Sequence, residues 1–119
     1  MKLSEIVEKL NLEVACGSSN LDSEVKRGYA SDLLSDVIAN SKEGDIWVTL
    51  QIHLNIVAVA SLNRLSGILL VNGRHPEDET VKKAETEGIP IVVSKLPAYE
   101  TIGRLYSLGI HGVDDAGGA

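Results

Sequence analysis

The amino-acid sequence predicts an α/β protein, a single domain of layered α/β/α architecture with a largely parallel central sheet of about five short strands. Its 119 residues are the usual length of one domain. Three short, almost continuously apolar runs, "DIWVTL", "GILLV" and "IPIVV", are typical of parallel strands buried on both faces. The segments 51–65 and 76–88 between these runs are each long enough for a crossover helix, which predicts two consecutive βαβ units.

The amino-terminal part of the chain predicts two helices and two further strands. Apolar residues recur there at the spacing of one helix face, and Ser4 is expected to cap that helix. These apolar residues are Leu3, Ile6, Val7 and Leu10. Residues 12–15 and 25–30 are expected to be extended and are separated by turn-forming residues. The Ser31-Asp32 pair predicts a cap for a helix over 33–41.

The middle of the chain contains one ambiguous segment. Residues 51–56 alternate polar and apolar side chains as a strand does, but a strand from Asp45 to Leu62 would exceed the usual ~3–10 residues. We therefore expect a strand to about Leu50 and a mostly buried helix from about His53. A last helix is expected over 98–108. Residues 111–119 have no periodicity and are expected to form a flexible tail after a domain at 1–110.

The composition and charge of the chain argue against two classes of binding partner, nucleic acids and membranes. The formal net charge is −6, and the basic residues are scattered in pairs, which argues against a nucleic-acid-binding surface. The amino terminus does not resemble a signal peptide, and no apolar run approaches the length of a membrane span. The single cysteine, Cys16, excludes an internal disulfide. A cytoplasmic protein with no nucleic-acid and no membrane partner is the expectation.

Three loops after predicted strands form the candidate site. In open α/β sheets, ligands bind at the carboxyl ends of parallel strands, particularly at a topological switch point. Amides, a guanidinium and two imidazoles at that edge would suit a small anionic or nucleotide-like metabolite. The alternative is that these loops are polar only because they are solvated. The candidate ligand-binding residues are Thr49, Gln51, His53, Asn72, Gly73, Arg74, His75 and Ser94.

Arg74 is the strongest single candidate because a guanidinium recognises phosphate or carboxylate with two hydrogen bonds. The acids that follow it at 77–79 suit the start of a helix but would repel a phosphate. Pairing of Arg74 with Glu77 or Asp78 is therefore favoured over ligand contact. The Asn72-Gly73 dipeptide is expected to form a turn at the end of a buried strand.

Sequence signatures of catalysis and of cofactor binding are missing. His53, His75 and His111 are far apart, without the spacing of a metal site. There is no P-loop, no G-x-G-x-x-G and no G-x-S-x-G. An enzyme that uses Cys16 or His53 is the least favoured hypothesis, so no enzymatic activity, no cofactor and no metal are expected.

Two stretches resemble the DRTGG domain family. These are "KEGDIWVTLQIHLNIVAVASLNRLSGILLVNGRHPEDETVKKAETEGIPIVVSKLPAYETIGRL" and the earlier "VKRGYASDLLSDVI". The shared features are a "GD" entering a strand, an apolar strand ending in a glycine turn, a proline-led helix, "GIPIV" and a terminal "T-x-x-x-L" helix. The chain departs from the family at its naming motif, where Asn72-Gly73-Arg74 replaces the Thr-Gly-Gly-like turn of many members.

The resemblance implies a noncatalytic regulatory or assembly role, commonly with dimerisation. In this family the domain accompanies HPr kinase/phosphorylase, some phosphotransacetylases and certain pyrophosphatases, and it also occurs as small standalone proteins beside hydrogenase-type genes. The first hypothesis is therefore a homodimeric regulatory module that senses a small anionic or nucleotide-like metabolite. The second is a protein-interaction scaffold for a partner enzyme, such as a redox (hydrogenase-type) or kinase system. A serine kinase activity is not expected, because the P-loop is missing.

Overall fold

A five-stranded sheet organises the computed structural model, which describes residues 1–114. The strands are β1 (Glu13–Cys16), β2 (Arg27–Ala30), β3 (Asp45–Thr49), β4 (Gly67–Leu70) and β5 (Ile91–Val93). The helices are α1 (Leu3–Leu10), α2 (Leu34–Asn40), α3 (Asn55–Leu62), α4 (Asp78–Glu87) and α5 (Ala98–Ser107), and a 3₁₀ turn covers Ser18–Asn20.

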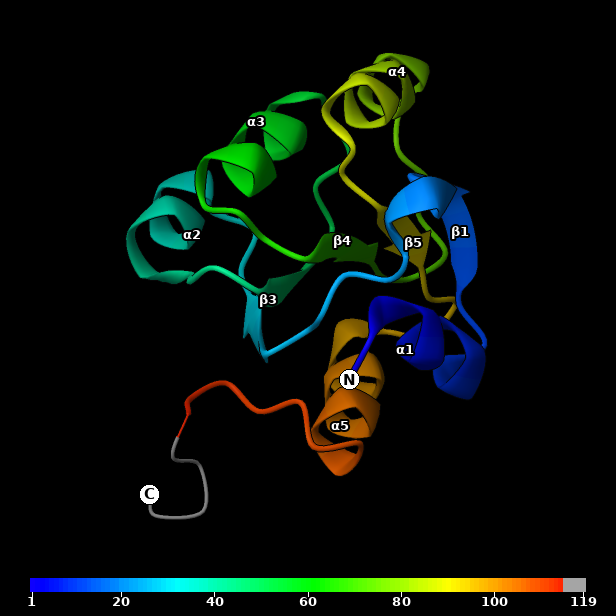
Figure 1. The fold of residues 1–119 in the computed structure, drawn as a ribbon, viewed down its shortest axis with the longest axis vertical. Coiled ribbons are helices and arrows are strands. Elements are labelled where there is room, and N and C mark those ends of the chain that lie inside the picture. Colours follow the sequence, from blue (N-terminus) through cyan, green and yellow to red (C-terminus); the bar gives the residue numbers. More distant parts are fainter. Residues whose placement is uncertain (115–119) are drawn as a thin grey trace.

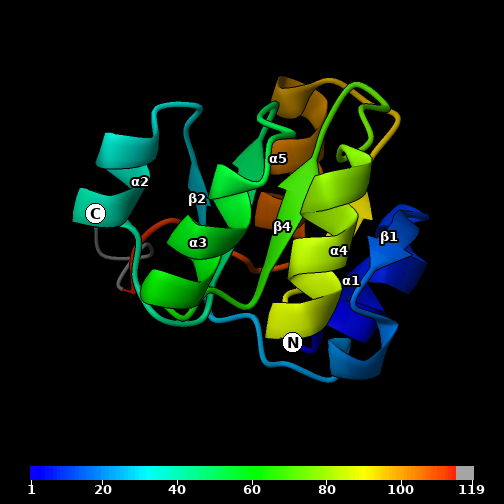
Figure 2. The same cartoon turned by 90° about the horizontal axis from the view of Figure 1, so that it is seen from above.

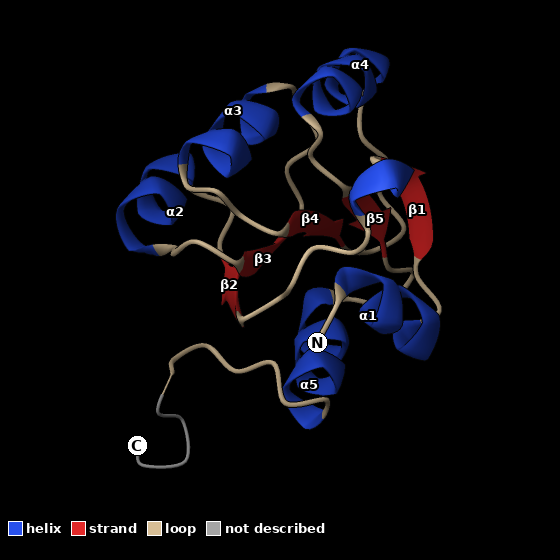
Figure 3. Cartoon of the chain, viewed as in Figure 1, coloured by secondary structure: helices blue, strands red, loops and turns tan. Residues whose placement is uncertain are grey.

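The strands lie in the order β1-β5-β4-β3-β2. β2 to β5 are parallel and adjacent in chain order, whereas β1 pairs with β5 in the antiparallel direction. Crossovers of one hand place their helices on one face of the sheet. Accordingly α2, α3 and α4 cover one face, and α1 and α5 cover the other (Figures 1 and 3). The predicted α/β/α fold with a largely parallel sheet is confirmed.

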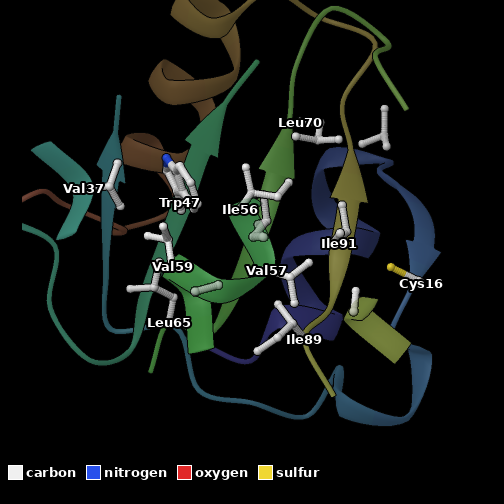
Figure 4. Close-up of a cluster of buried hydrophobic side chains, with 14 residues drawn as sticks. Cys16, Val37, Trp47, Ile56, Val57, Val59, Leu65, Leu70, Ile89 and Ile91 are labelled. Carbon is white, nitrogen blue, oxygen red and sulfur yellow. The ribbon is translucent and has the colours of Figure 1, made fainter. Parts of the chain in front are cut away.

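Side-chain alternation along the strands fills two cores, one on each face of the sheet. Trp47 points to the side of α2–α4, while its neighbours Ile46 and Val48 belong to the core under α1 and α5. Figure 4 shows the first core, where Trp47 lies beside Ile56 and Val59 of α3. Burial on both faces explains why these strands are continuous apolar runs in the sequence.

The predicted elements are all present, and the ambiguous segment is resolved. Residues 51–54 form neither strand nor helix but a loop, after which α3 begins at Asn55. β3 ends at Thr49, one residue before the expected Leu50. The helix expected over 98–108 is α5, which ends at Ser107.

Ser4 does not cap α1, and Asp32 does not cap α2. α1 begins at Leu3, and the first-turn amides of Leu3 and Ser4 donate to the carbonyls of Ser23 and Leu21. This neighbouring backbone takes the place of a serine cap. α2 begins at Leu34 with Leu33 at its N-cap position; the Leu33 amide donates to the hydroxyl of Ser31 at 3.2 Å, whereas Asp32 is bonded to Thr49 of β3.

The carboxyl-terminal segment after α5 returns to the sheet edge. The Gly28 amide of β2 donates to the carbonyl of His111 at 2.9 Å, and Arg27 forms an ion pair with Asp114. Residues 115–119 of the expected tail lie outside the described residues. Across residues 1–114, no helix is long and apolar enough to span a membrane.

Gly17 follows β1 at the start of the 3₁₀ turn and packs closely against Pro90. It has a φ of +76°, and a Cβ built there would lie 2.5 Å from the Cα of Pro90. Gly73 has a similar φ of +65°, but a Cβ there would meet no atom within 4 Å. A side chain at either position would therefore cause backbone strain, but only a side chain at Gly17 would also clash with neighbouring backbone.

We predict that Gly17→Ala lowers the free energy of unfolding by substantially more than Gly73→Ala. Both variants should lose the roughly 1–2 kcal/mol that a left-handed conformation costs an L-residue. Only Gly17→Ala adds a clash with backbone, which cannot move aside as a side-chain tip can. Urea unfolding of both variants followed by circular dichroism measures the difference, and equal losses would contradict the close approach of Gly17 to Pro90.

Candidate functional site

Asp32 joins the carboxyl ends of β2 and β3. The hydroxyl of Thr49 and the amide of Leu50 both donate to its Oδ1, at 2.7 and 2.8 Å. The side-chain amide of Gln51 donates to the Asp32 carbonyl at 2.9 Å. Two of the predicted site residues, Thr49 and Gln51, are thus brought together by an aspartate that sequence reasoning had assigned to a helix cap.

A hollow of about 210 Å³ opens beside Asp32. Its walls are the carboxyl ends of β2, β3 and β4 and the first residue of α5. The lining residues are Ala30, Ser31, Asp32, Val48, Thr49, Leu50, Val71 and Ala98. Within residues 1–114 no group donates to Oδ2 of Asp32, so this oxygen can accept a hydrogen bond from a ligand. Ligand pockets usually measure ~300–1,000 Å³, so this hollow suits only a small group.

The Asn72-Gly73 pair forms the predicted turn. Both residues have positive φ, 59° and 65°, and the Arg74 amide donates to the Val71 carbonyl at 3.2 Å. Positive φ at both central positions defines a type I′ turn, for which Asn-Gly is the preferred sequence. The amides of Asn72 and Gly73 donate to the carbonyls of Leu96 and Ser94. Because all three turn amides are engaged, the loop cannot cradle a phosphate with its backbone.

Ser94 anchors α5 and is buried. Its Oγ lies 2.9 Å from Oγ1 of Thr101 and accepts a hydrogen bond from the Leu96 amide. Only 4 % of Ser94 is exposed. Its hydroxyl therefore holds the β5–α5 loop in place rather than facing a ligand.

The histidines at the rim each contact a glutamate. His53 Nδ1 donates to Glu77 at 2.8 Å, and His75 Nε2 donates to Glu13 at 2.9 Å. The expected pairing of Arg74 with Glu77 or Asp78 is wrong, because Glu77 is already paired with His53 and Arg74 has no ion pair within residues 1–114. In the same range, no three His, Cys, Asp or Glu side chains are grouped as metal ligands would be.

The predicted residues share one edge of the sheet but not one cavity. Because β2 to β5 are adjacent in chain order, these strands contain no topological switch point that would open a crevice. Thr49 alone of the eight residues lines the hollow at Asp32, and Gln51 donates to the backbone carbonyl of that aspartate. His53, Asn72, Gly73, His75 and Ser94 contact other parts of the protein.

A comparison with models of known protein families identifies the family of the chain. The family model described as the DRTGG domain matches residues 5–108. The chain belongs to the DRTGG domain family. None of the curated proteins compared with it matches.

A solved structure shares this DRTGG fold. It contains the CBS and DRTGG domains of the regulatory region of Clostridium perfringens pyrophosphatase, complexed with the activator diadenosine tetraphosphate. The TM-score is 0.70 at 18% sequence identity, and the match covers 95% of this chain but 48% of that chain. The present chain therefore spans about half of that regulatory region.

Cys16 of this DRTGG domain lies in β1 and is buried. Burial, followed by the negative charge of Glu85, raises the pKa of its thiol from the ordinary value of 9.0 to about 11. A cysteine nucleophile requires the opposite shift, because the thiolate is the reactive form. The Cys16 thiol is therefore held in its unreactive form at neutral pH.

We predict that iodoacetamide modifies Cys16 very slowly in the folded protein at pH 8 and rapidly in urea. The thiol is shielded and neutral when folded but exposed, with an ordinary pKa, when unfolded. The contribution of Cys16 to stability should be constant below about pH 9 and fall toward pH 11, because the unfolded chain loses this proton first. Mass spectrometry of the alkylated protein measures the rate, and rapid labelling in native buffer would contradict the burial.

Proposed function

We propose that this DRTGG domain is a noncatalytic regulatory module that acts as a homodimer and senses a nucleotide-like metabolite at the rim of its sheet. The observation that carries the ligand-binding part is the hollow at the carboxyl ends of β2, β3 and β4, which Asp32 lines and where its Oδ2 accepts no hydrogen bond from residues 1–114. Family membership supports the regulatory part. The pyrophosphatase region of the same fold, complexed with a dinucleotide activator, supports the ligand class.

The hollow matches a ribose better than a phosphate. Ribose hydroxyls would donate to Oδ2 of Asp32, as they do to acidic residues in dinucleotide-binding sheets. The apolar walls formed by Val48, Val71 and Ala98 would cover the uncharged part of the sugar. A phosphate inside the hollow would meet a carboxylate with no cation among the lining residues, so the charged part of the ligand must lie outside.

Arg74 would bind that charged part. It follows Val71, a lining residue of the hollow, by three positions, and it is exposed. A guanidinium without an ion pair in the described residues can bind a phosphate with two hydrogen bonds. A nucleotide would then run along the rim from the end of β3 toward the turn after β4.

A ligand in the hollow would contact three separate elements of the fold at once. The ligand would touch the β2–α2 loop through Asp32, the end of β4 through Val71 and the start of α5 through Ala98. A ligand that binds only the folded arrangement stabilises it by mass action. Occupancy would therefore fix α5 against the sheet, which gives the module a way to report the ligand.

We predict that adenosine, AMP, ATP or diadenosine tetraphosphate raises the melting temperature of the wild-type chain. At a concentration of ~100 times the dissociation constant, the gain is about 2.7 kcal/mol. Asp32→Asn should weaken binding of all four, whereas Arg74→Gln should weaken only the phosphorylated three. Asp22→Asn, which changes an exposed charge before β2 and is not among the lining residues of the hollow, serves as the matched control.

Calorimetric titration of the same variants gives the affinities directly. Equal losses for adenosine and ATP in Arg74→Gln would contradict the assignment of the phosphate to Arg74. If none of the four compounds shifts the melting temperature at millimolar concentration, the sensing part of the proposal fails.

A second candidate function is a scaffold for a partner enzyme, such as a redox or kinase system. The observation that favours it is an apolar stripe on the outer side of α5. Tyr99, Ile102 and Tyr106 follow helical spacing and are 92%, 37% and 54% exposed. Aromatic residues of this kind are enriched in protein interfaces.

One variant on α5 tests the scaffold candidate. If α5 docks a partner, Ile102→Glu should release an enzyme that co-purifies with the wild-type chain, while Leu62→Glu on α3 should retain it. Nucleotide binding should be unaffected in Leu62→Glu. Retention of the partner by Ile102→Glu would remove α5 as the docking surface.

A further inference from the structure

A second, smaller hollow lies between α5 and the edge strand β2. It measures about 90 Å³, and its apolar lining residues are Val48, Ile102, Leu105 and Ile110. In Figure 2, α5 lies behind the sheet, and the chain that follows it leads to the side of β2. The hollow is too small for a whole nucleotide, but part of one flat ring can enter it.

This hollow adjoins the one at Asp32. Ala30 and Val48 line both, whereas Val71 lines only the hollow at Asp32. The smaller hollow is therefore displaced toward β2, away from β4 and from Arg74. In a nucleotide, the base and the 5′-phosphate are attached on opposite sides of the ribose. With the ribose at Asp32 and the phosphate at Arg74, the base would point toward the smaller hollow.

The open edge of β2 offers one hydrogen-bond acceptor and one donor at this hollow. The Ser31 amide donates to the Val48 carbonyl of β3 at 3.2 Å, so the backbone groups of residues 29 and 31 face the sheet. Those of Gly28 and Ala30 alternate with them and face away from β3. The Gly28 amide accordingly donates to His111. Within residues 1–114, no group outside the sheet bonds to the Gly28 carbonyl or to the Ala30 amide.

This acceptor and donor complement a base that carries an amino group beside a ring nitrogen. The amino group of adenine or cytosine would donate to the Gly28 carbonyl, and the adjacent ring nitrogen would accept from the Ala30 amide. Guanine, hypoxanthine and uracil have an oxygen acceptor and an N–H donor at these two positions, so acceptor would face acceptor and donor would face donor. The β2 edge therefore favours adenine and cytosine.

Two aromatic rings at the hollow provide a stacking surface. The ring centroids of Tyr106 and His111 are 4.2 Å apart, with 31° between the ring planes, and both residues line the hollow. Tyr106 is 54% exposed, so a ligand can reach its ring. Bases stack on aromatic side chains through their flat faces. Because the double ring of a purine has the larger face, this surface favours adenine over cytosine.

We infer that this hollow is the base subsite of the module and that it selects adenine. The inference rests on the proposed function and specifies its ligand as an adenine nucleotide. The nucleotide would lie across the ends of three strands, with its base at β2, its ribose at Asp32 and its phosphate at Arg74. It would contact α5 at both ends, at Ala98 beside the ribose and at Tyr106 beside the base.

Four nucleotides with the same ribose phosphate test the selection of the base. In calorimetric titrations of the wild-type chain, AMP should bind most tightly and CMP second. IMP and UMP should be weaker than AMP by roughly tenfold or more, because their pattern of donor and acceptor is reversed. Equal affinities for AMP and IMP would overturn selection by the β2 edge. CMP that binds as tightly as AMP would overturn the preference for a purine.

Tyr106→Ala tests the stacking surface. It should weaken AMP binding roughly tenfold, whereas Tyr106→Phe keeps the ring and should bind like the wild type. Tyr99→Ala is the matched control, since Tyr99 is a more exposed tyrosine of the same helix and does not line the hollow. Circular dichroism melts verify that each variant is folded. Unchanged AMP affinity in Tyr106→Ala, or an equal loss in Tyr99→Ala, overturns the subsite.

Photolabelling locates the base directly. Under ultraviolet light, 8-azido-AMP should label the tryptic peptide that follows Arg104, which contains Tyr106 and His111. An excess of AMP should suppress this label. Mass spectrometry of the digest identifies the labelled peptide, and the lack of an AMP-suppressible label on it contradicts the placement of the base.

The outcomes separate this inference from the proposed function. If none of the four nucleotides binds, nucleotide sensing and the base subsite fail together. If all four bind with equal affinity, sensing at the rim stands and the base subsite alone is overturned.

Discussion

The pairing of four parallel strands in chain order is the constraint on which the rest of the structure depends. It requires each connection from β2 to β5 to cross the same face, so α2, α3 and α4 form one layer and leave the other face to α1 and α5. It also brings the loops after β3, β4 and β5 to one edge. The same constraint removes the switch point at which many sheets of this class open a ligand crevice.

Hydrogen bonds within the protein then determine which polar groups at that edge remain available to a ligand. The turn at Asn72-Gly73 donates its amides to the β5–α5 loop, and the hydroxyl of Ser94 is bonded to α5. These bonds stiffen the part of the rim that faces β5. Near β2 and β3 the bonds converge on one aspartate and leave space beside it. The available chemistry of the rim is therefore concentrated at one side of the sheet.

The sequence was sufficient to predict every strand and helix, because two-sided burial gives apolar runs and helices give periodic ones. It was also sufficient for the Asn72-Gly73 turn, because this dipeptide itself favours a type I′ turn. It failed at Asp32, since a Ser-Asp pair before a helix has the pattern of a cap, whereas its actual partner, Thr49, is 17 residues away. Long-range side-chain pairing, including that of Glu77 with His53, has no local signal.

The contact between His111 and Gly28 has a consequence for the solubility of the chain. β2 is an edge strand, and edge strands with free amides are templates for pairing between molecules. The segment after α5 occupies the Gly28 amide and sets Asp114 against Arg27, which covers this edge with irregular backbone and charge. Residues 111–114 thereby protect the edge strand from pairing with strands of other molecules. A chain truncated after Ile110 would lose this protection.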